Sequence, residues 1–398
     1  GRPVLHYVLT VLCQMGIRKP KVVVGYEAEK VCSFLKKWKK ESGTYPEAVL
    51  QREQKGTGHA VMTARSAISR GQDDLLIWPG DMPLLTQGTL EEFIRQHRGT
   101  RSEASVLSSL RVDPTGYGRI LRAGGRFYAI REELDATPAE KRGQEVNTGI
   151  YLFRSGRLFR TLRDIRPENK KGEFYLTDCI EILSKNNCRL HAFPLASSQE
   201  GQGINSRADL AEVTRVINQR EIEHHMEKGV TFVAPDQTYI AQGIKIGRDT
   251  VIYPWCYIEA GVRIGRGCQI GPYAKIRKGS MIGDGSIVGS FVEVNRSKLG
   301  KKVYAKHLTY LGDAVVGDQA NIGAGTITAN FDGSAKHTTR IGKKVLVGSN
   351  TVFVAPVNVG DNAQTGAGAV VTRGSHVKKR EVVVGIPARP LKKKGKRD

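Results

Sequence analysis

Ten aliphatic residues lie six positions apart without interruption: Ile240, Ile246, Ile252, Ile258, Ile264, Ile270, Ile276, Ile282, Val288 and Val294. A period of six fits neither an α-helix nor an alternating β-strand. It is typical of a parallel β-helix, in which each hexapeptide supplies one short strand and one turn. Several of these residues are followed by Gly, which tolerates tight turns. The second half of the chain is therefore predicted to form a β-helix with the aliphatic side chains inside.

The period continues beyond residue 294 but changes phase twice. It resumes four residues out of register at Val316 and Ile322. It then continues in a third register at Ile341, Val347, Phe353, Val359 and Val371, with Thr365 filling one position. We interpret each phase change as an insertion, one within 295–315 and one within 329–340. Insertions in repeat proteins map to loops on one face, which often bind ligands, so chemistry is expected at these two places.

Size and charge restrict the function. The 398 residues predict two or three domains. No apolar stretch approaches the length of a membrane-spanning helix, so no membrane partner is expected. The net charge of +23 fits either nucleic-acid binding or a basic surface with sites for phosphorylated substrates. We favour the second, because the basic residues are scattered and known nucleic-acid motifs are absent. The six Cys lack CxxC spacing, which is typical of reduced thiols in the cytoplasm.

Short apolar runs alternate with amphipathic stretches in the first half of the chain, which predicts an α/β domain with a mostly parallel sheet over residues 1–205. The expected strands are 21–25, 47–50, 74–78, 105–110, 148–153 and 189–195. The first pattern in the chain is helical, with Val4, Val8, Leu12 and Met15 on one face. Such a domain normally opens with a strand and a ligand-binding loop, so we expect the chain to lack the start of this domain.

A single helix is predicted to join the two domains over residues 206–229. Ser206 and Asp209 have the spacing of an N-cap and its acidic partner, and Gly229 is a stop signal. The β-helix domain then covers 230–390, and a basic tail covers 391–398. His224 and His225 on this helix suggest a metal, but adjacent residues face different sides of a helix. A structural role is therefore favoured for both.

Four segments of the first domain carry residues that suit phosphate chemistry. Asp81 follows a buried strand directly, behind Gly80, which lets a backbone approach closely. This arrangement suits a metal–phosphate site, although a surface turn would look the same. The other segments combine Gly with Thr or Asn, at 51–60, 113–119 and 145–149. One such segment could be an ordinary turn, but a set of four rarely arises by chance.

The order of these motifs, GTGHA, GDxPL, DPTGYGR, Glu132 and EVNTG, resembles one bacterial family. It is the bifunctional N-acetylglucosamine-1-phosphate uridyltransferase/glucosamine-1-phosphate N-acetyltransferase family. The resemblance continues through the hexapeptide region and covers essentially the whole chain. It implies an α/β nucleotidyltransferase domain (Rossmann-like, mostly parallel sheet) followed by a left-handed parallel β-helix of hexapeptide repeats. It also implies a cytoplasmic homotrimer that makes UDP-N-acetylglucosamine, a precursor of peptidoglycan and, in Gram-negative organisms, of lipid A.

The resemblance implies a set of ligands in the first domain. Asp81 and Asn205 would hold Mg²⁺, with UTP as co-substrate. The ligands of UDP-N-acetylglucosamine would be Gln51, Gly56 and Thr57 at the uracil, Gly118, Glu132 and Asn147 at the N-acetylglucosamine moiety, and also Gly80 and Asn205. A sugar phosphate would attack the α-phosphorus of UTP in line, and the metal would offset the charge that develops. The family opens with a strand and a Gly-rich loop that cradles the phosphates, and this chain lacks both. We therefore expect uridyl transfer by this polypeptide to be impaired.

The segment HLTYLGDA, from His307 to Ala314, matches the acetyltransferase motif of the family. One His in a β-helix could be structural, but His can accept a proton near neutrality, as acetyl transfer to an amine requires. His307 is therefore the expected general base, with acetyl-CoA and glucosamine 1-phosphate as substrates. The oxyanion donor is expected to be a backbone amide near the coenzyme A groove. The implied sugar-phosphate ligands are Arg277, Asn295, Tyr310, Asn321 and Lys336. The implied acetyl-CoA groove contains Ala324, Asn330, Phe331, Ser349, Ala367 and Arg389.

One position departs from the family, which usually has Lys where this chain has Asn295. Arg296 could replace it, but neighbouring residues on a strand point to opposite faces, so weaker substrate binding is expected there.

Two other functions remain open. In the first, the β-helix only oligomerises a sugar-nucleotide pyrophosphorylase, which the HLTYLGDA segment and the predicted insertions disfavour. In the second, the basic chain is a scaffold for an anionic polymer, with binding that depends steeply on salt.

Overall fold

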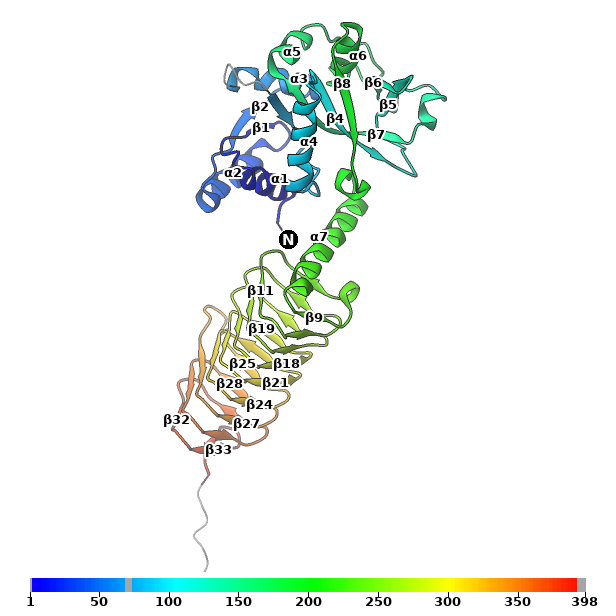
Figure 1. The fold of residues 1–398 in the computed structure, drawn as a ribbon. Coiled ribbons are helices and arrows are strands. Elements are labelled where there is room, and N and C mark those ends of the chain that lie inside the picture. Colours follow the sequence, from blue (N-terminus) through cyan, green and yellow to red (C-terminus); the bar gives the residue numbers. More distant parts are fainter. Residues whose placement is uncertain (1, 69–73, 392–398) are drawn as a thin grey trace, which may run out of the picture. The chain divides into compact units, whose positions relative to one another are not determined.

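The computed structural model describes residues 2–68 and 74–391 and contains two compact units, Arg2–Val213 and the chain from Thr214 onward. Figure 1 shows the α/β unit and the β-helix. The boundary falls within helix α7 (Arg207–Glu227), inside the segment predicted to link the domains. The predicted basic tail lies outside the described residues except for Leu391. Among the described helices, none has both the length and the apolar composition needed to span a bilayer.

The first unit alternates helices and strands, and each of the six predicted strands is present. The helices are α1 (Val4–Gln14), α2 (Ala28–Ser42), α3 (Thr57–Ala64), α4 (Gln87–Gly99), α5 (Ser155–Thr161) and α6 (Asp178–Lys185), with short 3₁₀ turns at Arg65–Ala67, Glu140–Arg142 and Ser198–Gly201. The strands are β1 (Lys21–Val24), β2 (Glu47–Leu50), β3 (Asp74–Ile77), β4 (Ala104–Leu110), β5 (Arg119–Ala123), β6 (Arg126–Arg131), β7 (Glu145–Arg154) and β8 (Leu190–Pro194).

The sheet of this unit is mixed in direction. In the described residues, β1 pairs with β2 in parallel, and a second sheet has the order β6-β5-β7-β4-β8 with β3 paired to β7. Strands β3, β4 and β8 run in one direction, as an α/β domain requires, whereas β7 is antiparallel to β3 and β4. The chain reaches β7 through the β5–β6 hairpin without a crossover helix, and only a crossover would return it in parallel. The motif EVNTG therefore lies on the antiparallel strand.

Helix α7 begins at the predicted capping box. The backbone N–H of Ser206 donates to Oδ2 of Asp209 at 2.8 Å, and the N–H of Asp209 donates to Oγ of Ser206 at 3.1 Å. These bonds satisfy two amides that the first turn of a helix leaves free. The helix ends at Glu227, and Gly229 follows with a φ of 83°, a conformation that favours glycine.

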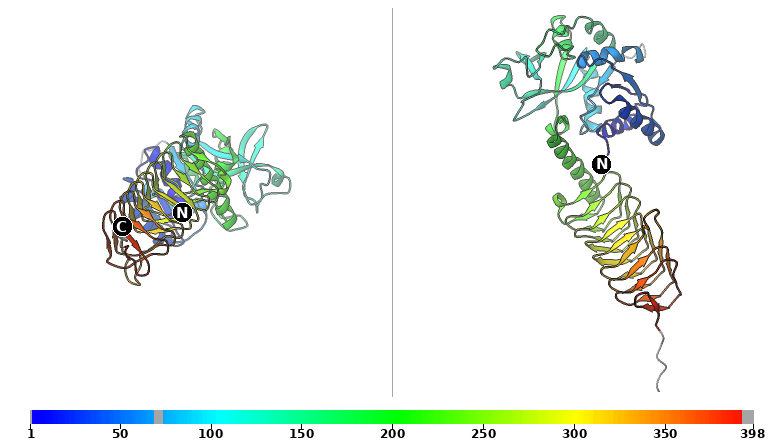
Figure 2. Two further views of the ribbon diagram at one scale, coloured as in Figure 1. Left: turned by 90° about the horizontal axis from the view of Figure 1, so that it is seen from below. Right: turned by 180° about the vertical axis from the view of Figure 1, so that it is seen from behind.

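The second unit is the predicted β-helix, whose coils stack in Figures 1 and 2. Within the described chain its strands form three faces, which we call sheets I, II and III. Sheet I contains β9 (Thr231–Phe232), β12 (Val251–Ile252), β15 (Gln269–Ile270), β18 (Ile287–Ser290), β21 (Tyr304–His307), β24 (Asn321–Ile322), β27 (Leu346–Val347), β30 (Gln364–Thr365), β33 (Val382–Val384) and the antiparallel β34 (Arg389–Pro390). Sheet II contains β10 (Tyr239–Ile240), β13 (Tyr257–Ile258), β16 (Lys275–Ile276), β19 (Glu293–Asn295), β22 (Tyr310–Gly312), β25 (Ile327–Ala329), β28 (Val352–Val354) and β31 (Val370–Val371). Sheet III contains β11 (Lys245–Ile246), β14 (Arg263–Ile264), β17 (Met281–Ile282), β20 (Lys298–Leu299), β23 (Ala314–Val316), β26 (Thr339–Ile341), β29 (Val357–Val359) and β32 (His376–Val377).

The aliphatic period fills the inside of the prism. Nine of the ten residues from Ile240 to Val294 are buried, and Ile246 is partly buried against the same core. Each coil takes three hexapeptides, so Tyr239 pairs with Tyr257 and Ile240 with Ile258, eighteen residues on. Except at the ends of the three sheets, each strand pairs with the coils above and below it, which is why two or three residues suffice for a strand here.

The first phase change is not an insertion, and that prediction was wrong. Val294, Leu299, Leu311 and Val316 are all buried in the core, and two of the steps between core residues contain only five residues. Met281 accordingly pairs with Lys298 and Lys298 with Val315, seventeen residues apart. Both short steps turn from sheet II to sheet III. A phase shift alone could not distinguish two single deletions from one insertion of four residues.

The second phase change is an insertion, as predicted. Ala314 pairs with Thr339, twenty-five residues on, and the extra residues form a small hairpin at the same corner between sheets II and III. The N–H of His337 donates to the carbonyl of Asn330 at 2.7 Å, and Phe331 pairs with Lys336. Three successive coils are therefore irregular at one corner.

Candidate active sites

The predicted uracil ligands of the first unit lie together at the start of helix α3. Nε2 of Gln51 lies 3.4 Å from the carbonyl oxygen of Gly56 and 2.9 Å from Nδ1 of His59. Gly56 has a φ of 100°, and a Cβ there would lie 2.7 Å from the carbonyl oxygen of Phe174. Glycine is therefore needed at this turn on two grounds. Thr57 accepts a hydrogen bond from the N–H of Leu176. These contacts join the end of β2, the start of α3 and the 174–176 loop.

The two predicted metal ligands are brought together by a backbone hydrogen bond. The N–H of Ile204 donates to the carbonyl of Asp81 at 3.0 Å, which places Asn205 beside the loop after β3. Both side chains are exposed. The surrounding protein raises the pKa of Asp81 by removing part of the water around its carboxyl group. Gly80 precedes Asp81 in the same loop, with open space beside it except for the side chain of Leu5.

A carboxylate and an amide oxygen fit Mg²⁺, which keeps several waters and binds substrate phosphates. In residues 2–68 and 74–391, no group of three or more His, Cys, Asp and Glu side chains is gathered as a metal cage.

The predicted sugar ligands of the first unit form a second cluster, at the start of β7. The N–H of Asn147 donates to the carbonyl of Gly118 at 2.8 Å, and a Cβ on Gly118 would lie 3.3 Å from Oε2 of Glu132. Desolvation raises the pKa of Glu132, while Thr177 donates to Oε1 at 3.1 Å. Nδ2 of Asn147 donates to the hydroxyl of Tyr151 at 2.7 Å. The pKa of that buried phenol is raised by desolvation, so it stays protonated. These contacts fix the positions of the donors and acceptors in the cluster.

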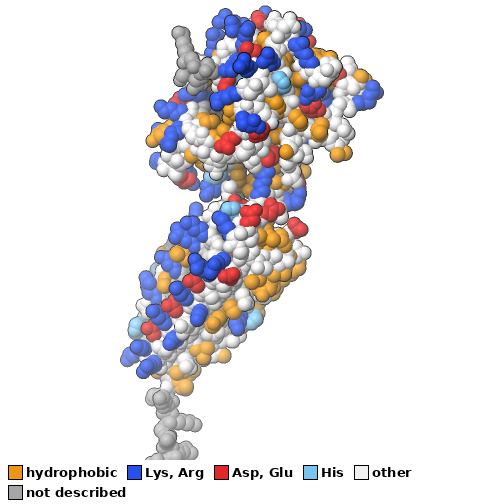
Figure 3. Space-filling model, in the orientation of Figure 1, with side chains coloured by type: hydrophobic (Ala, Val, Ile, Leu, Met, Phe, Trp, Pro, Cys, Tyr) orange, Lys and Arg blue, Asp and Glu red, His pale blue; other side chains and the backbone are white. Residues whose placement is uncertain are grey.

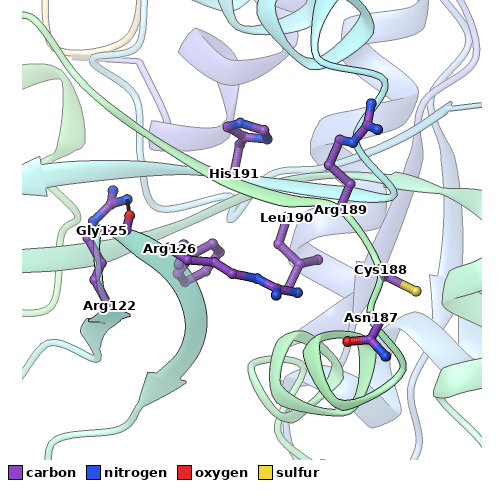
Figure 4. Close-up of a pocket in the computed structure, with 9 residues that line it drawn as sticks. Arg122, Gly125, Arg126, Asn187, Cys188, Arg189, Leu190 and His191 are labelled. Atoms are coloured by element: carbon purple, nitrogen blue, oxygen red, sulfur yellow. Dashed lines mark hydrogen bonds between the residues drawn. The ribbon is translucent and has the colours of Figure 1, made fainter.

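A cavity of about 380 Å³ lies elsewhere in the first unit, between the β5–β6 turn and the start of β8. It is lined by Arg122, Gly125, Arg126, Phe127, Asn187, Cys188, Arg189, Leu190 and His191. Arg189 and His191 point to one side of strand β8, and Arg126 lies on the other (Figure 4). None of the predicted site residues lines this cavity, and its basic side chains do not converge on one point.

On the β-helix, His307 lies at the head of a column of small residues. It ends β21, where it pairs with Ser290 of the coil before. The same position in the following coils is occupied by Ala324, Ser349 and Ala367, as the registers of β24, β27 and β30 show. The N–H of Asn350 donates to the carbonyl of Ala324, and that of Gly368 to Ser349, both at 2.7 Å. Three of the residues predicted for the acetyl-CoA groove thus form one straight edge below His307.

The imidazole of His307 is exposed and makes no hydrogen bond to the described part of the chain. Its backbone is held firmly: the carbonyl accepts from Oγ1 of Thr309 at 2.7 Å, and the N–H of Leu308 donates to Ser290 at 3.0 Å. A fixed backbone with an accessible, uncommitted ring suits a group that must take a proton from a substrate.

The irregular corner between sheets II and III gathers a polar network. Arg296 binds Asp313 through two hydrogen bonds of 2.7 Å and donates to Oδ1 of Asn295 at 2.9 Å. Nδ2 of Asn295 lies 3.4 Å from the hydroxyl of Tyr310. Asn330 donates to Asp313 from the hairpin. The charge of Arg296 and the amide of Asn330 hold the pKa of Asp313 below its ordinary value.

The strand-alternation argument against Arg296 does not apply. Strand β19 ends at Asn295, and Arg296 lies in the shortened turn with a φ of 50°. The side chain therefore folds back onto its neighbour instead of pointing to the other face. A cation does lie beside Asn295, although Asp313 balances its charge.

The remaining predicted ligands lie on different parts of the β-helix surface. Arg277 directly follows β16 of sheet II and lies between Glu293 at 3.0 Å and Glu259 at 3.7 Å. Asn321 begins a strand of sheet I, so one copy of the chain does not gather these two residues on one face. Phe331 and Lys336 are exposed on the hairpin, and Arg389 is exposed on β34.

Sequence reasoning missed Asp313 as the centre of the corner network and Thr177 as the partner of Glu132. The position of Asp313 one coil after Arg296 was the available signal, but it becomes visible only when the coil is known to contain seventeen residues.

The fold and these clusters define a class of protein, a nucleotidyltransferase joined to a hexapeptide-repeat acyltransferase. The model of the nucleotidyl transferase family matches residues 1–197. The bacterial transferase hexapeptide model matches 243–278 and 261–296, and the hexapeptide repeat of succinyl-transferase matches 338–373.

Curated relatives named bifunctional protein GlmU match almost the whole chain. The protein of Pseudothermotoga lettingae is 41% identical over 94% of this chain and 88% of its own length. The protein of Pelotomaculum thermopropionicum is 39% identical over 90% of this chain and 84% of its own length. The protein of a Geobacillus strain is 38% identical over 94% of this chain and 87% of its own length. The chain belongs to the GlmU family of bifunctional enzymes, which carry both acetyltransferase and uridyltransferase activities. The predicted family and fold class are confirmed.

Proposed function

We propose that the β-helix acetylates glucosamine 1-phosphate with His307 as general base, and that the first unit then transfers uridyl from UTP to the product. The observation that carries this proposal is the column formed by His307, Ala324, Ser349 and Ala367. It supplies a proton acceptor at one end of an edge whose small side chains leave the backbone accessible to a long thioester.

In the acetyl transfer, the 2-amino nitrogen attacks the thioester carbonyl and forms a C–N bond. His307 removes a proton from that nitrogen, the C–S bond breaks, and coenzyme A leaves as the thiolate, which takes up a proton. The sugar phosphate would be held by Tyr310, the Asn295–Arg296 pair, Arg277, Asn321 and Lys336. Guanidinium groups suit this task because their planar fork can bind two oxygens.

In the uridyl transfer, Asp81 and Asn205 would hold Mg²⁺, which supplies positive charge against the phosphates when it is bound. Gln51, Gly56 and Thr57 orient the uracil, and Gly118, Glu132 and Asn147 orient the N-acetylglucosamine moiety. Their hydrogen bonds support these roles, because a fixed arrangement of donors and acceptors would hold the two substrates in position for in-line attack.

We also propose that the cytoplasmic enzyme is a homotrimer in which a second copy completes each acetyltransferase site. Trp255, Tyr273, Phe291 and Leu308 form an exposed ladder at the corner next to His307. Successive rings stack at centroid distances of 4.9 and 5.0 Å. Figure 3 shows hydrophobic side chains along one edge of the β-helix and Lys and Arg along the other. An apolar edge of this kind favours association. A partner surface would also bring together ligands that, like Arg277 and Asn321, lie on different faces of one copy. The six cysteines, all in described residues and all free, support a cytoplasmic location.

The deciding experiment replaces His307 by Ala in the full chain and follows coenzyme A release from acetyl-CoA in the presence of glucosamine 1-phosphate. We expect kcat to fall by about 10²–10⁴-fold, the usual contribution of a general base. His376→Ala is the matched control, because His376 is an exposed residue of β32 in the same β-helix. Wild-type rates in the His307 variant would remove His307 from the mechanism. Pyrophosphate release from UTP and N-acetylglucosamine 1-phosphate, measured in the same samples, should not change.

A further inference from the structure

The inserted hairpin of residues 330–338 is held by an arginine from a later coil. Nη1 of Arg373, which follows β31, lies 3.1 Å from Oδ2 of Asp332. Nε2 of His337 lies 2.6 Å from the same oxygen, and Nη2 of Arg373 is 3.2 Å from that ring nitrogen. The side chains of Asp332 and His337 are 23% and 25% exposed, whereas that of Arg373 is 52% exposed. An ion pair thus joins the hairpin to a coil with which it shares no strand pairing.

Asp332 is also the cap of the hairpin turn. Its Oδ1 accepts from the N–H and Oγ of Ser334, both at 3.0 Å, and from the N–H of Ala335 at 2.8 Å. Gly333, with a φ of 97°, permits the turn. These amide hydrogen bonds, with His337, hold the pKa of Asp332 well below its usual range. The carboxylate therefore stays charged and keeps Arg373 bound over the working pH range.

The two faces of the hairpin differ in what they carry. Side chains alternate along each strand, and directly paired residues share a face. Phe331 pairs with Lys336, so these two lie on one face, whereas their chain neighbours Asp332 and His337 contact each other and Arg373. Phe331 and Lys336 are exposed. When Arg373 fixes one face, it fixes the direction of the opposite face.

We propose that Arg373 is a positioning residue for acetyl transfer, which aims Lys336 and Phe331 by gripping the Asp332–His337 face of the hairpin. This inference rests on the proposed function, in which Lys336 binds the sugar phosphate and Phe331 lines the acetyl-CoA groove. Asn330 anchors the base of the hairpin through Asp313, so Arg373 controls only its outer part. The loss of Arg373 should therefore weaken substrate binding and leave the proton transfer at His307 unchanged.

The test compares the wild type with Arg373→Ala, Arg373→Lys, Lys336→Ala and the Arg373→Ala/Lys336→Ala double variant, in steady-state kinetics with glucosamine 1-phosphate. We expect Arg373→Ala to raise KM about tenfold with kcat within a factor of about three. Arg373→Lys should raise KM less than Arg373→Ala does, because an ammonium group can still pair with Asp332 although it lacks the planar fork of a guanidinium group. The KM of the double variant should be no higher than that of Lys336→Ala alone, because both substitutions act through the same side chain. Arg340→Ala is the matched control, since Arg340 is exposed on β26 and has no ion pair within the described residues.

Hydrogen exchange of amides 331–337 provides a readout that does not depend on activity. Exchange should be faster in Arg373→Ala than in the wild type and unchanged in Arg340→Ala. Unchanged exchange, an unchanged KM in Arg373→Ala, or additive effects in the double variant would each overturn the inference. A wild-type enzyme without acetyltransferase activity would instead contradict the proposed function, and the exchange data would still decide whether Arg373 holds the hairpin. A raised KM in Arg373→Ala with a silent Lys336→Ala would refute the role of Lys336 in both proposals.

Discussion

Gly289 sets the position of His307, and its replacement by Ala tests that dependence. Gly289 lies one residue before Ser290, the pairing partner of His307. A Cβ on Gly289 would lie 2.1 Å from the carbonyl oxygen of Lys306 and 2.8 Å from its carbonyl carbon. Both atoms belong to the backbone, so no side-chain rotation can relieve the contact. To restore van der Waals separation, the strand that carries His307 must move by about 1 Å. A shift of about 1 Å at a reacting group commonly costs about 10²-fold in rate.

We expect Gly289→Ala to lower kcat/KM for acetyl transfer by about 10²-fold while the β-helix stays folded, as judged by circular dichroism and the thermal midpoint. Gly360→Ala is the matched control, because a Cβ there would lie 2.6 Å from the backbone nitrogen of Lys379, far along the chain from the column of His307. It should lower the midpoint similarly and change kcat/KM by no more than a few fold. If folded Gly289→Ala keeps full activity, or if Gly360→Ala loses as much, the link between coil packing and the position of His307 is refuted.

Three further predictions concern the corner network, the metal and one acidic group. Arg296→Ala should raise the KM for glucosamine 1-phosphate about tenfold. The substitution removes the cation beside Asn295 and leaves Asn330 as the side-chain hydrogen-bond donor to Asp313 within the described residues. An unchanged KM would mean that Arg296 is purely structural. Removal of Mg²⁺ with EDTA, or Asp81→Asn, should abolish any pyrophosphate release from UTP and leave acetyl transfer intact, as one coupled assay of both products can show. Desolvation and the nearby Glu181 raise the pKa of Asp178 to about 6, so the folded state favours its protonated form, and that stability is lost as the pH rises from about 4 through 6. Asp178→Asn should therefore resist urea better than the wild type at pH 8 and equally at pH 4, and a constant difference at both pH values would contradict the shift.

The β-helix could be predicted almost completely from the sequence because its core repeats. One aliphatic side chain per hexapeptide must point inward, and this requirement is local, so the pattern is visible residue by residue. The α/β unit was also predictable in its strands, since runs such as residues 75–77 are short and apolar. The antiparallel direction of β7 was not, because direction depends on the connection through the β5–β6 hairpin and not on the residues of the strand.

The sequence could name the candidate site residues but not their arrangement. Resemblance supplied His307, Asn295 and Tyr310, whereas the partners that orient them come from coils seventeen residues apart, a spacing the hexapeptide pattern conceals. The inference that Arg296 points away from Asn295 was wrong. It assumed a continuing strand where the structure has a tight corner.

The three irregular coils explain why the polar site lies where it does. A regular β-helix offers only repeating surfaces, so a unique site needs a break in the repeat. Here the two five-residue steps and the inserted hairpin stack at one corner in consecutive coils. The short steps put Arg296 and Asp313 into left-handed backbone conformations, with φ of 50° and 48°, and let their side chains meet face to face. Asn330 of the third coil then binds the same carboxylate and starts the hairpin. The departures from periodicity are therefore what gives a structural repeat one unique polar surface, and Asp313, which contacts both other coils, holds that surface together.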